Sequence, residues 1–261
     1  VHGGYSQKDV QEVARCLTGW TTERHWHRGR FLFDPSRHDD GSKQVLGIFI
    51  PAGGGITDGE RVLDLLAAHP ATADHLARKL CLHFLGSSPA ALARAVARTF
   101  QATGGDIAAL VRQILLSADM VTAPPILKRP LDFMTSALRA LDADTDCGLA
   151  LQAHMEKMGQ PLFAWPMPDG YPEKASAWTG SLIPRWKFAL ALTASQIDNT
   201  AIDWAALTNA GRAHGLSTLE TLAELAFGSP DAADFGDLAK NRAGPAHCGA
   251  ALLMSPQFQW R

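Results

Sequence analysis

Histidines and carboxylates that could bind a metal ion are concentrated in one segment near the amino terminus. His25 and His27 are two residues apart, which on a strand places both imidazoles on one face. His38, Asp39 and Asp40 follow in the same segment. Imidazoles combined with a carboxylate suit zinc or another divalent ion with an open position for water. One hypothesis is therefore a metal site of His25, His27, His38 and Asp40, with His38 and Asp39 as catalytic residues of a metal-assisted hydrolase.

The same segment also has a purely structural interpretation. Asp40 precedes Gly41, a pair typical of a turn, and His38 and Asp39 could hold that turn by hydrogen bonds to the backbone. Trp26, between the two outer histidines, favours an exposed loop over a metal site. Both interpretations remain open at the level of the sequence.

Three further residues around this segment are candidates for ligand binding: Trp20, Arg15 and Lys43. Glu12 and Arg15 are three apart on an expected helix, where a surface ion pair contributes little. If they face the segment instead, Arg15 could bind an anionic group through two hydrogen bonds.

A second group of candidates lies in a proline-rich, aromatic stretch at about residues 160–176. Trp165, Tyr171 and Trp178 offer flat rings for stacking on a sugar or a peptide, and Asp169 and Arg185 could orient the ligand or act catalytically. An aromatic loop that only covers a helical core is the alternative.

The composition limits the classes of function. The chain has 261 residues, of which 46% are hydrophobic and 19% charged, which is enough to bury a sizeable core. The net charge of -2 provides no basic field for a phosphate backbone, so we expect no nucleic-acid partner. No apolar run reaches the ~18 residues of a membrane span. Most of the four cysteines lie among apolar residues and are expected to be buried.

The elements that must position these candidates are mostly short helices. The pattern predicts a mainly α fold over residues 1–261, a single domain in the form of an irregular helical bundle with one small antiparallel β-hairpin at about 30–50. The strands of that hairpin are expected at 31–33 and 43–50. Ser6 with Asp9, and Thr57 with Glu60, are predicted to form capping boxes that begin two of the helices.

Several motifs together resemble the bacterial family called domain of unknown function 1800. They include Tyr5-Ser6-Gln7, Leu17-Thr18-Gly19-Trp20, His38-Asp39-Asp40-Gly41, Gly59-Glu60, His69-Pro70, Asp169-Gly170-Tyr171-Pro172 and Ser255-Pro256. The resemblance implies an exported protein, periplasmic or extracellular, of which this chain corresponds to the C-terminal half. It also implies two partners, the N-terminal half and a sulfatase-like protein encoded by a neighbouring gene.

Two functions are consistent with these features. The first is a binding or scaffold module of the cell envelope that engages a glycan or a partner protein through the aromatic loop. The second is the metal-assisted hydrolase centred on His38 and Asp39, with zinc or another divalent metal as its cofactor.

Overall fold

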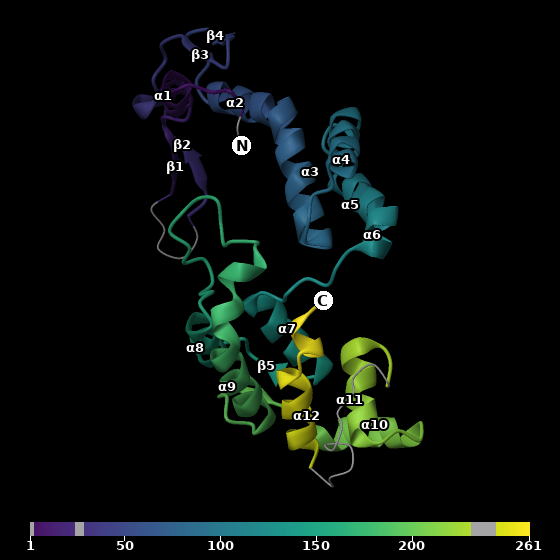
Figure 1. The fold of residues 1–261 in the computed structure, drawn as a ribbon. Coiled ribbons are helices and arrows are strands. Elements are labelled where there is room, and N and C mark those ends of the chain that lie inside the picture. Colours follow the sequence, from purple (N-terminus) through teal and green to yellow (C-terminus); the bar gives the residue numbers. More distant parts are fainter. Residues whose placement is uncertain (1–2, 24–28, 231–243) are drawn as a thin grey trace. The chain divides into compact units, whose positions relative to one another are not determined.

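Short α-helices dominate the computed structural model, which describes residues 3–23, 29–230 and 244–261. Within these ranges it contains twelve α-helices and three two-stranded antiparallel sheets, so the expected mainly α fold is confirmed (Figure 1). The chain divides into two compact units, Val1–Ala123 and Pro124–Arg261, which are described separately. None of the described helices is both long and apolar enough to cross a membrane.

Unit 1 begins with α1 (Gln7–Cys16), whose first turn is stabilised as the sequence predicts. The Ser6 hydroxyl accepts a hydrogen bond from the Asp9 amide, and the Asp9 carboxylate accepts from the Ser6 amide, which completes a capping box. α1 packs against β3 (Lys43–Val45). Cys16 at the end of the helix belongs to a small core with Val45 and Val62.

The strands pair differently from the prediction. β1 (Trp20–Thr22) pairs with β2 (Phe31–Phe33), and β3 pairs with β4 (Ile48–Ile50), so the single hairpin expected between 31–33 and 43–50 is wrong. The turn between β3 and β4 explains the error, because Leu46 and Gly47 have φ values of 50° and 80°. Two positive φ angles are typical of a tight type I′ turn, which leucine rarely adopts.

The rest of unit 1 is helical: α2 (Thr57–Ala68), α3 (Pro70–Leu85), α4 (Ala90–Thr103), α5 (Ile107–Leu115) and α6 (Ala118–Thr122). Cys81, Val96 and Leu110 are at the centre of the core shared by α3, α4 and α5. The capping box expected at Thr57 is wrong, since the Thr57 hydroxyl donates to the Gly54 carbonyl oxygen and α2 has no side-chain cap. The next residue, Asp58, is buried.

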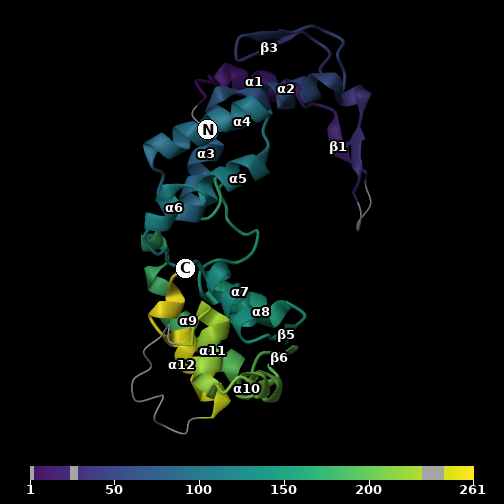
Figure 2. The same cartoon turned by 90° about the vertical axis from the view of Figure 1, so that its right-hand side faces the viewer.

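Unit 2 consists of α7 (Pro130–Ala140), β5 (Asp144–Thr145), α8 (Leu149–Lys157), α9 (Leu182–Thr193), β6 (Thr200–Ala201), α10 (Trp204–Ala213), α11 (Thr218–Phe227) and α12 (Pro245–Met254). α12 packs against both α9 and α11 (Figure 2). Phe133 is at the centre of its core, edge-on to Phe188 and Phe258 at 6.0 and 5.7 Å. Residues 158–174 contain no helix or strand, as the proline-rich loop predicts.

Candidate functional site

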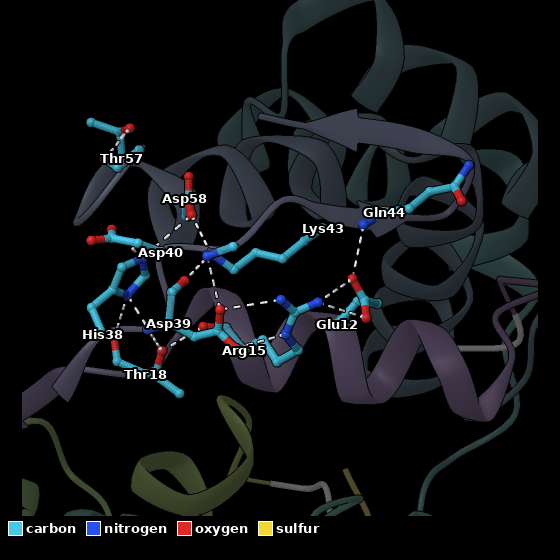
Figure 3. Close-up of polar contacts among 12 residues, drawn as sticks. Glu12, Arg15, Thr18, His38, Asp39, Asp40, Lys43, Gln44, Thr57 and Asp58 are labelled. Atoms are coloured by element: carbon cyan, nitrogen blue, oxygen red, sulfur yellow. Dashed lines mark hydrogen bonds and ion pairs between the residues drawn. The ribbon is translucent and has the colours of Figure 1, made fainter. Parts of the chain in front are cut away.

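Charged side chains of unit 1 meet where α1, β3 and the start of α2 come together (Figure 3). The contributors are Glu12 and Arg15 of α1, His38 and Asp39 after the short 3-10 helix Pro35–Arg37, Lys43 of β3 and Asp58 of α2. Sequence positions that are more than 40 residues apart are thus brought into one cluster.

Asp58 is the central anion of this cluster. Its side chain is 0% exposed, and its Oδ2 accepts a hydrogen bond from Lys43 Nζ at 2.6 Å. His38 Nε2 lies 3.3 Å from the same oxygen. Lys43 Nζ, which is equally buried, also donates to the backbone carbonyl oxygen of Asp39. Because neither charge reaches water, each depends on the other for compensation.

His38 is fixed by contacts on both ring nitrogens. Its side chain is 1% exposed, and Nδ1 lies 2.8 Å from the backbone carbonyl oxygen of Thr18. A carbonyl oxygen can only accept, so Nδ1 carries the hydrogen in this contact. The Thr18 hydroxyl accepts from the Asp39 amide at 2.8 Å and donates to the Arg15 carbonyl oxygen. These contacts hold the imidazole against Asp58.

Two carboxylates of α1 bind the backbone of the β3–β4 hairpin. Asp9 Oδ1 accepts from the Leu46 amide at 2.7 Å, and Glu12 Oε2 accepts from the Gln44 amide at 3.0 Å. The Ser6 hydroxyl lowers the pKa of Asp9 to about 2, and the Gln44 amide lowers the pKa of Glu12. Both carboxylates are therefore ionised acceptors at neutral pH.

Arg15 is the third α1 side chain of this set and binds a carboxylate through two hydrogen bonds. Its Nε and Nη2 donate to the two oxygens of Asp39 at 2.8 and 3.1 Å, and its Nη1 donates to Glu12. The guanidinium, followed by the Gly41 amide, holds the pKa of Asp39 at about 2. The sequence suggested that Arg15 could bind an anionic group in this way, and the anion it binds is Asp39 of the same chain.

The donor set at His38 does not fit a divalent metal ion. The Asp58 oxygen nearest the imidazole already accepts from the Lys43 ammonium, a cation that would repel a metal ion at that position. Among the described residues, no group of three His, Cys, Asp or Glu side chains is arranged to hold a metal. Asp40 is largely exposed, 3.9 Å from His38 Nε2. His25 and His27, the other predicted ligands, lie outside the described residues.

Trp20 packs inside unit 1. Its ring lies so close to α2 that a Cβ added to Gly59 would be 2.4 Å from Trp20 Cζ2. Phe31 contacts the same ring edge-on at 5.1 Å. The close approach of the Trp20 ring to α2 therefore requires glycine at position 59. The Trp20 indole nitrogen and Asp58 Oδ1 are buried, and the described residues provide neither with a hydrogen-bond partner.

The aromatic candidates of unit 2 contact one another within their loop. The rings of Trp165 and Tyr171 are 4.9 Å apart, and those of Tyr171 and Trp178 are 6.0 Å apart. Trp165 Nε1 donates to Asp169 and Trp178 Nε1 donates to the Pro172 carbonyl oxygen, at 3.0 and 2.9 Å. The Tyr171 hydroxyl donates to the backbone as well. Trp178 is buried, so it anchors the loop.

Arg185 of α9 is 2% exposed and connects three parts of unit 2. It donates to the Ser181 hydroxyl, the Gln259 side-chain oxygen and the Lys128 carbonyl oxygen at 2.9, 3.2 and 2.6 Å. Burial lowers the pKa of Arg185 to about 10. Lys128 is also buried, with Nζ 3.8 Å from the centre of the Phe258 ring, and burial lowers its pKa to about 8.

Apolar side chains are exposed on the loop and on α9. Phe163 is fully exposed with φ 58°, and Met167 is exposed as well. On α9, Ile183, Trp186 and Leu190 are 62%, 40% and 51% exposed. Their spacing of three and four residues places them along one face, whereas the opposite face contributes to the core.

Sequence reasoning missed two features of these sites. Asp58 was not among the candidate residues, because acidic residues are common in the first turn of a helix and no local pattern separates them from one that is buried against a distant lysine. The exposed apolar face of α9 was also not predicted. The available signal was that the apolar residues of α9 fall on more than one face, since Ile183, Trp186 and Leu190 do not share a face with Phe188 and Leu192.

Comparison with known proteins gives one match. The family model described as "Protein of unknown function (DUF1800)" matches residues 1–260. No curated protein and no solved structure matches this chain.

Proposed function

The chain belongs to the DUF1800 family, and from that premise and the exposed apolar surfaces of unit 2 we propose that it is a cell-envelope module that binds a partner protein. The observation that carries the proposal is the outer face of α9, formed by Ile183, Trp186 and Leu190. Exposed apolar side chains at helical spacing mark interaction surfaces, because in water they are costly to leave uncovered. Tryptophan is also enriched among the residues that dominate binding energy.

The aromatic loop supports a protein partner over a glycan. Sugar recognition combines a flat ring with polar groups that bind the hydroxyls. In this loop the polar atoms of Trp165, Tyr171 and Trp178 already bind groups of the same chain. The side chains left exposed, Phe163 and Met167, are apolar, and they fit an apolar protein surface.

The polar cluster of unit 1 gives less support to a metal-assisted hydrolase. A general base or a metal ligand needs a lone pair that is accessible to the substrate or the ion. His38 and Asp58 are buried, and their contacting atoms already bind Thr18 and Lys43. We therefore propose that this cluster has a structural role, in which it holds α1, the segment before β3 and the start of α2 together.

The compartment and the partners follow from the family resemblance. We propose an exported protein, periplasmic or extracellular, whose partner is the sulfatase-like protein of the neighbouring gene. The N-terminal half of longer family members is the other candidate partner.

A binding measurement between this protein and the sulfatase-like protein, both purified, tests the proposal. Calorimetry should give a Kd for the sulfatase-like protein, and Trp186→Glu should weaken it by ~30-fold, as expected for a central tryptophan. Ile183→Glu should also weaken binding. Leu149→Glu is the matched control, because Leu149 is 82% exposed at the start of α8 and is not part of the α9 face.

Each result discriminates between the candidates. Equal affinities for wild type and both α9 variants would remove the α9 face as the binding surface. Binding of soluble glycans that Phe163→Ser abolishes would favour the glycan alternative. Activity that depends on a divalent ion and is lost in His38→Ala would restore the hydrolase.

A further inference from the structure

An apolar groove of about 340 Å³ opens on unit 1, far along the sequence from the α9 face. Its walls come from α1 and the segment before it, from β3 and the turn that follows, and from the end of α2 and the start of α3. The apolar lining includes Tyr5, Val10, Val13, Leu46 and Leu66. The volume lies within the range of about 300–1,000 Å³ that is typical of ligand sites. The groove is therefore large enough to receive several side chains.

The apolar surface extends beyond the groove. Val45 at its base is buried, whereas Tyr5, Val10 and Leu66 at its rim are 59%, 45% and 39% exposed. Leu63, one turn before Leu66 on α2, is 52% exposed as well. A small molecule in the groove would leave Leu63 uncovered, so the area fits an elongated occupant better.

Among the residues that the structure describes, the only carboxylate that lines the groove belongs to Asp9, and none of the described lysines or arginines lines it. Three hydrogen bonds reach this carboxylate, from the Ser6 amide, the Ser6 hydroxyl and the Leu46 amide. A carboxylate has about four acceptor positions, so one remains for an occupant. A positively charged group is the complement of an ionised carboxylate at the edge of an apolar surface.

His69 lines the same groove and offers a donor. Its Nδ1 accepts from the Ala71 amide at 3.1 Å, so the hydrogen of the neutral ring is on Nε2. An Nε2–H group suits a carbonyl oxygen, and the last turn of a helix leaves its carbonyl oxygens without intrahelical partners. Together with Asp9, it provides two polar contacts that can orient an apolar segment.

We propose that this groove docks an amphipathic helical segment of a partner polypeptide that carries a lysine or arginine beside its apolar stripe. Apolar anchors three or four residues apart would enter between Val10 and Leu66 and continue over Leu63. The basic side chain would bind Asp9. This surface is distinct from the α9 face, so its test is independent of the function proposed above.

Selection from a library of random 16-residue peptides tests the proposal on the full chain. The selected peptides should share apolar residues at i, i+3 or i+4 and i+7, and a lysine or arginine next to them. Leu66→Glu and Val10→Glu should each weaken their binding by at least ~10-fold, since each places a charge on an apolar anchor site. Leu116→Glu is the control, because Leu116 is 77% exposed at the end of α5 and does not line the groove.

Both groove substitutions are at partly exposed positions, and circular dichroism spectra should match the wild type. Three results would overturn the proposal: selected peptides that bind the Glu variants as tightly as wild type, selected peptides that are acidic, or no selected peptide at all. Sedimentation that shows a wild-type dimer and a Leu66→Glu monomer would assign the groove to a second copy of this chain instead.

Discussion

Removing the Asp58 carboxylate should destabilise unit 1 strongly, although the substitution Asp58→Asn changes almost no volume. The carboxylate is 0% exposed and is 2.6 Å from the equally buried Lys43 Nζ. Breaking a buried ion pair by removing one partner costs about 3–5 kcal/mol, because the other charge stays buried without compensation. A domain has only about 5–15 kcal/mol of stability, so the loss should be plain in urea unfolding at pH 7.

A double-mutant cycle separates this electrostatic cause from a packing effect. Lys43→Met alone should also be costly, because it leaves the Asp58 anion buried, whereas the two substitutions together should cost less than their sum by about 2 kcal/mol or more. Asp64→Asn makes the same chemical change at an exposed position of α2 and should stay within about 0.5 kcal/mol of wild type. Hydrogen exchange of amides in α1 and α2 reports on unit 1 alone. A loss below about 1 kcal/mol for Asp58→Asn, or strict additivity, would refute the reasoning.

Three further predictions concern single residues. Gly59→Ala should destabilise the protein by about 1–3 kcal/mol in thermal unfolding, because the new Cβ would be 2.4 Å from Trp20 Cζ2 and the clash outweighs the better helix propensity of alanine. Lys128→Met should stabilise it at pH 7 by at most about 3 kcal/mol. Burial lowers the folded-state pKa of Lys128 from 10.5 to about 8, so folding disfavours its charged form. The free energy of unfolding of the wild type should therefore rise between pH 8 and 10.5, and the difference between Lys128→Met and wild type should shrink in the same range. Asp39→Asn should weaken the dependence of the free energy of unfolding on pH at acidic pH, measured by urea unfolding. The pKa of Asp39 is lowered from 3.8 to about 2, so its stabilising contribution is lost as the pH falls through that range. An unchanged pH dependence would contradict the Arg15 contact.

The sequence was informative where structure depends on neighbouring residues. The capping box of Ser6 and Asp9 is a local pattern and was predicted correctly. The strand pairing was wrong because Leu46 has a positive φ, which leucine rarely adopts, so Gly47 alone was not interpreted as a turn between two strands. Asp58 is in the first turn of α2, where acidic residues are common, and only tertiary packing brings Lys43 to it.

Four of the candidate residues lie together in the structure. His38, Asp39, Arg15 and Lys43 meet in one cluster. Their roles depend on how many of their polar atoms remain free to bind a ligand. Neighbouring backbone groups decide this, and the positions of those groups cannot be predicted from the sequence. The Thr18 carbonyl oxygen beside His38 is an example.

The polar cluster and the apolar groove use two adjoining faces of the same helix. Asp9, Glu12 and Arg15 recur every three residues on α1 and bind the segment that leads into β3 and its turn. Val10 and Val13, each one residue further along, line the groove. The contact between Asp9 and the Leu46 amide therefore fixes one wall of the groove relative to the other. A groove held rigid in this way loses less conformational entropy when it is filled, which is a reason for charged side chains of α1 to bind the backbone of the β3–β4 hairpin in a protein whose proposed role is binding.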